Sequence, residues 1–339
     1  MSDSYTFLSA LLAQKQQAYG KALEYAVAAA LLAALNTRGA QAALTDSDAA
    51  RTAHHRYDAL ADEARAKYDL GARAGVRLLA RLEPVLQAPA QDERFTLRIQ
   101  ADVQGEAGDV RDVVVESARG WTLGVSVKHN NDVAKNPRLA RTLDFCQHWT
   151  NHTCDANYFD AIAPVFTELE RQSAIGAHWS ALHLTEQEKA ARFYRPVLLA
   201  LAAQLERLAR QHTDAPSALV AYFLGRQDFY KLIVSMPTRT TTVQAFSFAG
   251  TLGQTPNVSK QNAAVNKSIV QITRLSLPTR LQAVAFKPHS DNTLLITFDR
   301  DWAFSLRLHN ASAYIETSLK LDVRMTSAPP GLVELQERW

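Results

Sequence analysis

The feature that most constrains the fold is a pair of β-rich runs joined by a tight turn. The first run, Asp112–Val115, reads DVVV, and the second, Trp121–Lys128, reads WTLGVSVK, with the turn signal SARG between them. Successive residues of a strand face opposite ways, so Ser126 and Lys128, which are two apart, point to one side. If the two runs pair as neighbouring strands, they bring Asp112 and Lys128 side by side.

A carboxylate beside an ammonium has a definite chemical use. A carboxylate supplies the hard oxygen ligands that Mg²⁺ prefers. A neighbouring lysine can neutralise or deprotonate groups around a scissile phosphate. Val113 and Val115 point away from this pair and can face a core. The pattern therefore predicts a site for metal-assisted phosphate chemistry on one face of a sheet, with Asp112 and Lys128 as the reacting groups.

The composition of the whole chain is that of an ordinary soluble globular protein, and its mild basic bias is compatible with nucleic-acid binding without establishing it. It has 339 residues, of which 47% are hydrophobic and 21% charged, and a net charge of +3. Two cysteines exclude a disulfide framework and fit a reducing compartment. The N-terminus lacks the pattern of a signal peptide, and the apolar run 26–35 is shorter than the roughly 20 residues that span a bilayer. We therefore expect a cytoplasmic protein without a membrane segment.

Three consecutive regions are expected along the chain. Residues 1–90 favour helices, including one over Tyr5–Leu35 with a buried stripe of Leu23, Val27, Leu31 and Leu35, and a second from Thr45 to Glu83 with a possible break at Gly71. Residues 91–248 combine strands, such as the alternating Arg94–Ala101, with helical segments. Residues 249–339 open with a polar loop over 251–266 and continue as an antiparallel β-rich region.

Two apolar runs in the middle region are predicted to be strands. These are DFYKLIVSM, from Asp228 to Met236, and TTVQAFSF, from Thr241 to Phe248. The first is short and nearly all apolar, which suits a central strand that extends the hairpin sheet. Before them, Thr185–His212 is predicted to be helical. The fold class expected from the whole pattern is a mixed α/β (α+β) protein.

The hairpin resembles the active-site hairpin of PD-(D/E)xK nucleases. Several segments resemble the sequences of HaeIII-type type II restriction endonucleases. They are DVRDVVV, GVSVKHN and KNPRLA within 108–141, GRQDFYK near 225–231 and LRLHNASAYIETSLKLDV near 306–323. The resemblance implies a PD-(D/E)xK core with an N-terminal helical region and a C-terminal β-rich subdomain. Two departures stand out: Gly-Asp-Val-Arg-Asp leaves Asp109 as a rival to Asp112, and Ser126 replaces the second acid.

A second acidic metal ligand must then come from elsewhere. Glu24 is the first candidate, because it lies beside the buried Leu23 stripe, four residues after Gly20, and because PD-(D/E)xK nucleases commonly begin with a helix that bears an active-site Glu. Asp144, in the segment after the hairpin, is the second candidate. The resemblance further implies that the main-chain carbonyl of Val127 helps to hold the metal and that Ser126 has a positioning role.

Polar residues after the hairpin are candidates for DNA contacts. Asn130 follows Lys128 in the run HNND, where it could contact a base or a phosphate, and Asn136-Pro137 suits the start of a helix. Such a helix would carry Arg138 and Arg141 on a common side, near a phosphate. Lys135 belongs to the same basic segment. His129 faces away from Lys128 in an extended strand, which favours a structural role.

The C-terminal β-rich region offers a second set of candidates for DNA contacts. These are Arg307, His309, Asn310 and Lys320. Arginine and lysine reading guanine, and asparagine reading adenine, are standard major-groove contacts. The same residues could equally be solvent-facing positions of antiparallel strands.

Four potential metal ligands occur within the nine-residue segment CQHWTNHTC. They are Cys146, His148, His152 and Cys154, but their spacing matches no common zinc module. We expect packing or surface roles for them.

The resemblance implies a DNA endonuclease that uses Mg²⁺ to cut both strands of a short palindrome, with GGCC the site of HaeIII-type enzymes. A palindromic site favours a homodimer, although a monomer that nicks each strand in turn is an alternative. Two other classes stay open at this point. One is a repair or structure-specific nuclease of the same fold. The other is a catalytically silent DNA-binding protein, since Ser126 stands where an acid is expected.

Overall fold

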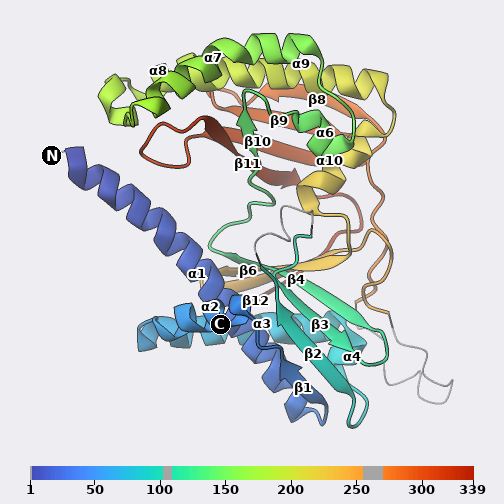
Figure 1. The fold of residues 1–339 in the computed structure, drawn as a ribbon. Coiled ribbons are helices and arrows are strands. Elements are labelled where there is room, and N and C mark those ends of the chain that lie inside the picture. Colours follow the sequence, from blue (N-terminus) through green and yellow to red (C-terminus); the bar gives the residue numbers. More distant parts are fainter. Residues whose placement is uncertain (1, 102–108, 255–269) are drawn as a thin grey trace. The chain divides into compact units, whose positions relative to one another are not determined.

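The computed structural model describes residues 2–101, 109–254 and 270–339, with side chains from Ala18 onward (Figure 1). The chain forms two compact units, each assembled from separate stretches of sequence. The seven-strand unit comprises Gln14–Asp132, Arg226–Leu275 and Gly331–Trp339. The five-strand unit comprises Met1–Ala13, Val133–Gly225 and Ser276–Pro330. The mixed helix and sheet class predicted from the sequence is confirmed, whereas these units cut across the three consecutive regions expected along the chain.

The seven-strand unit is built on one mixed sheet with the strand order β1-β2-β3-β4-β6-β7-β12. The strands are β1 (Gln41–Leu44), β2 (Arg94–Ile99), β3 (Val113–Ser117), β4 (Thr122–His129), β6 (Phe229–Ser235), β7 (Thr240–Phe246) and β12 (Val333–Arg338). β1 pairs with β2 and β4 with β6 in parallel, and the other neighbours are antiparallel. As the apolar run DFYKLIVSM predicted, β6 lies in the centre of the hairpin sheet.

Helices pack on one face of this sheet. They are most of α1 (Ser2–Thr37), α2 (Asp48–Asp58), α3 (Asp62–Leu82) and α4 (Pro84–Gln87). The predicted stripe of α1 is fully buried: Leu23, Val27, Leu31 and Leu35 join one core with Val113, Val125 and Leu232 of the sheet. The part of α1 from Ala18 to Thr37 has the length and composition of a membrane span, with 44% of the tested window buried in the protein. Its apolar stripe is accounted for by this core.

Two glycines let α3 lie close to the sheet. A β-carbon at Gly75 would come within 2.4 Å of Leu232, and one at Gly71 within 2.5 Å of Val234. The helix break expected at Gly71 is therefore wrong. The helices α2 and α3 are separated at residues 59–61 instead, and Gly71 serves the close approach of α3 to β6.

The hairpin forms as predicted. Val113 of β3 pairs with Val125 of β4 in an antiparallel ladder, which places Asp112 opposite Ser126. The turn between the strands contains Gly120 with a φ of 86°, a conformation that glycine adopts without strain.

The five-strand unit contains one antiparallel sheet with the order β5-β11-β10-β9-β8. Its strands are β5 (Arg138–Ala140), β8 (Leu281–Phe286), β9 (Thr293–Phe298), β10 (Ala303–His309) and β11 (Ser318–Ser327). Its helices are α6 (Phe145–Thr150), α7 (Ala156–Ala174), η1 (Trp179–Leu182), α8 (Glu186–Lys189), the π-helical turn η2 (Ala190–Tyr194), α9 (Arg195–Gln211) and α10 (Ala215–Leu224). Figure 1 shows α7 and α9 running along one side of this sheet.

Three features of the two units differ from the sequence expectations. The helix predicted to start at Asn136-Pro137 is wrong, because residues 138–140 form β5, which pairs with β11 through Arg138 and Lys320. The last strand, β12, leaves the C-terminal β-rich region and pairs with β7 of the other sheet. Residues 270–275 of the run IVQITRL are not a strand, and most of the polar loop expected over 251–266 lies outside the described residues.

Candidate active site

Asp112 lies on the polar face of the seven-stranded sheet, just before β3. Its Oδ2 accepts a hydrogen bond of 2.6 Å from the main-chain N–H of Val127 and one of 3.3 Å from the hydroxyl of Ser126. Lys128 Nζ lies 3.7 Å from the same oxygen. In the part of the chain that the structure describes, no donor contacts the second oxygen, Oδ1. One carboxylate oxygen is thus fixed by the protein while the other remains available.

The side chains of Asp112 and Lys128 are partly buried and still accessible to a ligand. The side chains of Asp112 and Lys128 are 25% and 24% exposed, whereas Ser126 is almost completely buried. A partly dehydrated site strengthens electrostatic interactions and still admits a ligand. The expected juxtaposition of carboxylate, hydroxyl and ammonium is present.

The main chain of Val127 adds a further oxygen on this side. In an antiparallel ladder the N–H and C=O of one residue point to the same neighbouring strand. Because the N–H of Val127 points to Asp112, its carbonyl points to the same edge. A carboxylate oxygen and a main-chain carbonyl are the hard ligands that Mg²⁺ prefers. These residues therefore fit a divalent cation.

Asp109, the rival acid, is occupied by other partners. Its two oxygens accept hydrogen bonds from Arg111 Nε and Nη2, at 2.7 and 2.6 Å, and from Gln100. Burial works to raise the pKa of Asp109, but these hydrogen bonds hold it below its usual value. A β-carbon at Gly124 would come within 2.0 Å of the Arg111 side chain, so glycine there makes room for this ion pair. Asp112, not Asp109, is the carboxylate beside Lys128.

Glu24 and Asp144, the candidates for the second acid, have different surroundings. Glu24 is 6% exposed in α1 and forms an ion pair of 3.0 Å with Lys21. Asp144 is the N-cap of α6 in the five-strand unit, where its carboxylate accepts hydrogen bonds from the main-chain N–H groups of Gln147 and Cys154. The cap accounts for Asp144, whereas Glu24 is a buried acid in the unit that contains Asp112.

His129 lies on the face of β4 opposite Lys128, as the strand alternation predicts. Its Nε2 is 3.1 Å from the hydroxyl of Tyr68 in α3, and its ring lies 5.7 Å from that of Tyr19 in α1. Burial lowers the pKa of His129. These contacts connect the end of β4 to two helices.

Lys231 is a buried cation of this sheet that the sequence analysis did not identify. It lies in β6 directly beside Ser126 of β4, is 4% exposed, and donates a hydrogen bond to the main-chain carbonyl of Asp132. The available signal was a lysine inside the otherwise apolar run FYKLIV.

The polar face of the five-stranded sheet brings several predicted DNA-binding residues together. Arg138 of β5 pairs with Lys320 of β11, which pairs with His309 of β10. Arg307, two residues before His309, therefore shares their face. The intervening leucines, such as Leu308 and Leu321, are fully buried on the other face. Strands distant in sequence thus produce one cationic surface, although Asp322, opposite Arg307, lies with its Oδ1 3.1 Å from Nε2 of His309.

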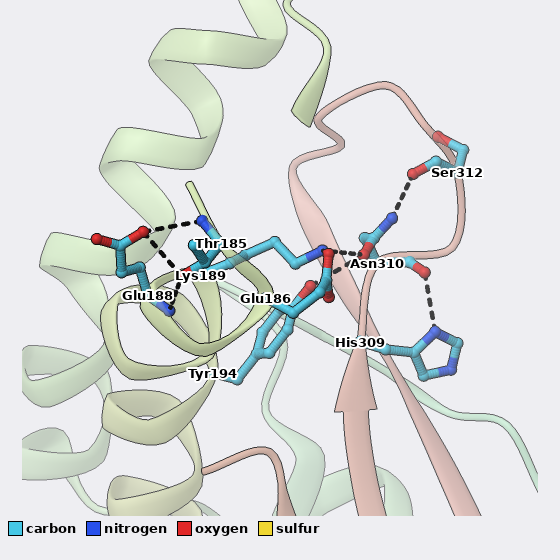
Figure 2. Close-up of polar contacts among 8 residues, drawn as sticks. All are labelled: Thr185, Glu186, Glu188, Lys189, Tyr194, His309, Asn310 and Ser312. Carbon is cyan, nitrogen blue, oxygen red and sulfur yellow. Dashed lines mark hydrogen bonds and ion pairs between the residues drawn. The ribbon is translucent and has the colours of Figure 1, made fainter. Parts of the chain in front are cut away.

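Asn310, another predicted DNA-binding residue, has its amide group occupied by the protein. Figure 2 shows its Oδ1 accepting hydrogen bonds from Tyr194, at 2.9 Å, and Lys189, at 3.4 Å, while its Nδ2 donates to the carbonyl of Ser312. Lys189 is also paired with Glu186 at 2.7 Å. These bonds fasten the chain after β10 to the helical segment α8–η2, which favours a structural role for Asn310.

The remaining candidates, Arg141, Lys135 and Asn130, are dispersed, and Arg138 has an acidic partner of its own. Arg138 and Arg141 form ion pairs with Glu316 and Glu170, and Arg141 follows β5 instead of sharing a helix with Arg138. The ammonium of Lys135 lies 3.7 Å from the centre of the Tyr222 ring. Asn130 of the seven-strand unit is exposed, and its side-chain oxygen accepts from the N–H of Met236.

Among the described residues, two further groups of potential metal ligands lie in the five-strand unit: Asp144 with Cys146 and Cys154, and His152 with His212 and Asp214. Cys146 and Cys154 have their sulfurs 2.8 Å apart, whereas two thiolates on one tetrahedral zinc ion, with bonds of about 2.3 Å, would lie roughly 3.8 Å apart. The rings of His152 and His212 stack at 3.7 Å with an angle of 15° between their planes, and Nε2 of His152 lies 3.1 Å from both carboxylate oxygens of Asp214.

The comparisons with known proteins agree with this geometry. Residues 20–329 match the family model described as HaeIII restriction endonuclease. The chain is 34% identical over 285 residues to the type II restriction enzyme HaeIII of Haemophilus aegyptius, which covers 84% of this chain and 86% of that protein. The chain belongs to the HaeIII restriction endonuclease family. None of the solved structures matches it.

Membership in the HaeIII family establishes the class of activity. This protein is a type II restriction endonuclease, a site-specific deoxyribonuclease that acts on DNA. The nuclease resemblance seen in the hairpin is thereby confirmed. The match also extends through β10 and β11, so it includes the cationic face of the five-stranded sheet.

Proposed function

We propose that this enzyme hydrolyses both strands of DNA at GGCC with Mg²⁺, at a site centred on Asp112 and Lys128. The observation that carries the proposal is the geometry of Asp112: one oxygen is held by Val127 and Ser126 next to Lys128, and the other accepts no bond among the described residues. Asp112 and the Val127 carbonyl would hold the metal ion, with Glu24 as the second acid.

The catalytic roles follow from the chemistry of each group. A bound Mg²⁺ offsets charge that develops on the phosphate and the leaving 3′ oxygen. The ammonium of Lys128, 3.7 Å from Oδ2 of Asp112, orients or activates the attacking water and stabilises the pentacovalent phosphorane. The hydroxyl of Ser126 holds the Asp112 carboxylate in place, because a hydroxyl is a weak ligand for Mg²⁺.

Recognition is assigned to the polar face of the five-stranded sheet. Arg307, Lys320 and Arg138 supply cations that suit phosphates and guanine bases, and His309 lies in the same row. Arg141 and Asn130 are assigned to contacts with the DNA backbone, whereas the buried ammonium of Lys135, over the ring of Tyr222, is assigned to packing and not to the DNA contact expected from the sequence. Asn310 positions the chain after β10 through the bonds shown in Figure 2. The GGCC site rests on the similarity to HaeIII-type enzymes.

The assembly and the compartment are part of the same proposal. GGCC is palindromic, so two copies of the chain related by a two-fold axis would place one active site on each strand. The enzyme would act in the cytoplasm, and two unpaired thiols, Cys146 and Cys154, suit that reducing compartment.

The test is cleavage of a duplex that carries one GGCC site and of a matched duplex that lacks it, in Mg²⁺ and in EDTA. We expect cutting of only the first duplex, and only in Mg²⁺. Cutting of both duplexes would contradict the GGCC assignment and favour a structure-specific nuclease. Binding without cutting in Mg²⁺ would contradict the active-site assignment and favour a catalytically silent protein.

A further inference from the structure

Lys231 is a buried lysine in the centre of the catalytic sheet. It is paired in parallel register with Ser126, so the two side chains leave the same face of neighbouring strands, about 4.8 Å apart. Ser126 is the residue that hydrogen-bonds to Asp112. A buried ammonium is costly unless it is well partnered, whereas an apolar side chain would fill this position without such a cost.

The hydrogen bond from Lys231 to Asp132 shows where the chain goes after β4. Asp132 is six residues beyond Ser126, and a straight strand would carry it ~20 Å further along the sheet. Its main-chain carbonyl nevertheless accepts a hydrogen bond from the Lys231 ammonium. The chain must therefore reverse after His129 and return over the polar face, towards the row that contains Ser126 and Asp112.

The reversal is located at Asn130. This residue has a φ of 56°, a left-handed conformation that asparagine tolerates better than most residues. Its N–H donates to the carbonyl of Val234, and its side-chain oxygen accepts from the N–H of Met236. The segment that reverses after β4 is thus held to the β6 region at two places. Asn130 is bound at the turn by Val234 and Met236, and Asp132 is bound two residues later by Lys231.

We propose that Lys231 is a positioning residue for DNA hydrolysis. By fixing the carbonyl of Asp132, it prevents the end of β4 from fraying and keeps Lys128, the penultimate residue of that strand, beside Asp112. The inference rests on the proposed catalytic role of Lys128. Displacement of a catalytic group by about 1 Å can reduce a rate about 100-fold.

The test compares Lys231→Met, which keeps the length of the side chain but removes its charge and its donors, with Lys231→Arg, which keeps both. The matched control is Thr241→Val. Thr241 is a fully buried residue of β7 in the same sheet, and its hydroxyl donates to the carbonyl of Gly71 in α3. The same oxygen accepts a hydrogen bond from the indole N–H of Trp339. The control therefore removes two hydrogen bonds of the seven-strand unit without touching the return of the chain.

Two readouts decide the proposal. In single-turnover cleavage, we expect Lys231→Met to lose about 100-fold in rate with the affinity for DNA unchanged, Lys231→Arg to recover part of the loss, and Thr241→Val to cleave as the wild type does. In hydrogen exchange, we expect residues 128–132 to exchange faster in Lys231→Met, but not in Thr241→Val, while Val243 and Ala245 stay protected.

Unchanged exchange over 128–132 in Lys231→Met would overturn the proposal, and so would a cleavage rate equal to that of Thr241→Val. If the wild type did not cut DNA, the proposed function would fail by itself. The exchange experiment would still decide whether Lys231 holds the chain after β4.

Discussion

The two sheets of this enzyme use their polar faces in different ways. The seven-stranded sheet carries a compact group, in which Asp112 and Lys128 are about one quarter exposed and Ser126 and Lys231 are buried. The five-stranded sheet carries cations in adjacent strands, with Arg138 and Arg307 exposed. Hydrolysis requires a few atoms held in fixed geometry, whereas recognition of a long polyanion requires an extended accessible surface. The proposed function therefore assigns catalysis and recognition to different units.

Removal of the catalytic groups should have the largest effect. We expect Asp112→Asn and Lys128→Ala each to reduce single-turnover cleavage by about 10³-fold, because each removes charge from the reacting centre. The affinity for a GGCC duplex, measured with Ca²⁺ in place of Mg²⁺, should change far less. An Asp112→Asn enzyme that cleaves normally, while Asp109→Asn does not, would reverse the assignment of the metal-binding acid.

The next effect concerns stability and is confined to the seven-strand unit. Burial raises the pKa of Glu83 to about 7, although hydrogen bonds from Gly253 and Tyr230 oppose the rise. The pKa of Glu83 in the folded protein exceeds its unfolded value near 4.5. The protonated Glu83 therefore contributes its full stabilisation of the folded state below pH 4.5, and this contribution is lost as the pH rises to 7. The free energy of unfolding should fall by on the order of 3 kcal/mol over that interval.

Glu83→Gln provides the check, because glutamine is neutral and keeps an acceptor for Tyr230. Urea unfolding at several pH values should show the variant gaining stability relative to the wild type between pH 5 and pH 8. The same stability difference at every pH would contradict the raised pKa. Hydrogen exchange should assign the pH effect to the seven-strand unit.

Loss of a cation from the recognition face should weaken binding. We expect Arg307→Ala to reduce affinity for the GGCC duplex by about 1–3 kcal/mol. If Arg307 contacts a base, its loss should also relax the sequence specificity. If it contacts a phosphate, its loss should make the slope of log affinity against log salt concentration shallower by about one. The control is Arg210→Ala, since Arg210 lies in α9 of the same unit, is 69% exposed and pairs with Glu206. Equal losses in both variants would refute a specific role for Arg307.

The smallest effect is expected for a substitution of Asp144. This substitution distinguishes a role as a helix N-cap from a role as a catalytic acid. Asp144→Ala should cost about 1 kcal/mol of stability, because α6 loses its N-cap hydrogen bond. The rate of cleavage should remain that of the wild type. A large loss of cleavage in a folded Asp144→Ala enzyme would show that Glu24 is the wrong choice for the second acid.

The sequence predicted the parts of the site that depend on local periodicity. Strand alternation and a tight turn suffice to place Asp112, Ser126 and Lys128 on one face, and the four-residue spacing of Leu23 and Val27 suffices for the buried stripe of α1. These features depend on neighbours in the chain. The structure adds only their distances and burial.

Features that depend on distant strands were not predicted. Asn136-Pro137 looked like a helix start, but pairing with β11 makes residues 138–140 a strand. Lys231 looked like one polar residue in an apolar run, and its significance comes from its register with Ser126 and its contact with Asp132. Both units are assembled from separate stretches of the chain for the same reason. Pairing between strands distant in sequence, and not local preference, decides which stretches belong together.

The central claim is that catalysis belongs to the seven-stranded sheet and recognition to the five-stranded sheet. The most direct test is single-turnover cleavage of a GGCC duplex by Lys128→Ala and Arg307→Ala at increasing enzyme concentration in Mg²⁺. The account predicts that Arg307→Ala approaches the wild-type rate once the DNA is saturated, whereas saturated Lys128→Ala stays about 10³-fold slower. A rate for Lys128→Ala that recovers at saturation, or one for Arg307→Ala that does not, would contradict this division.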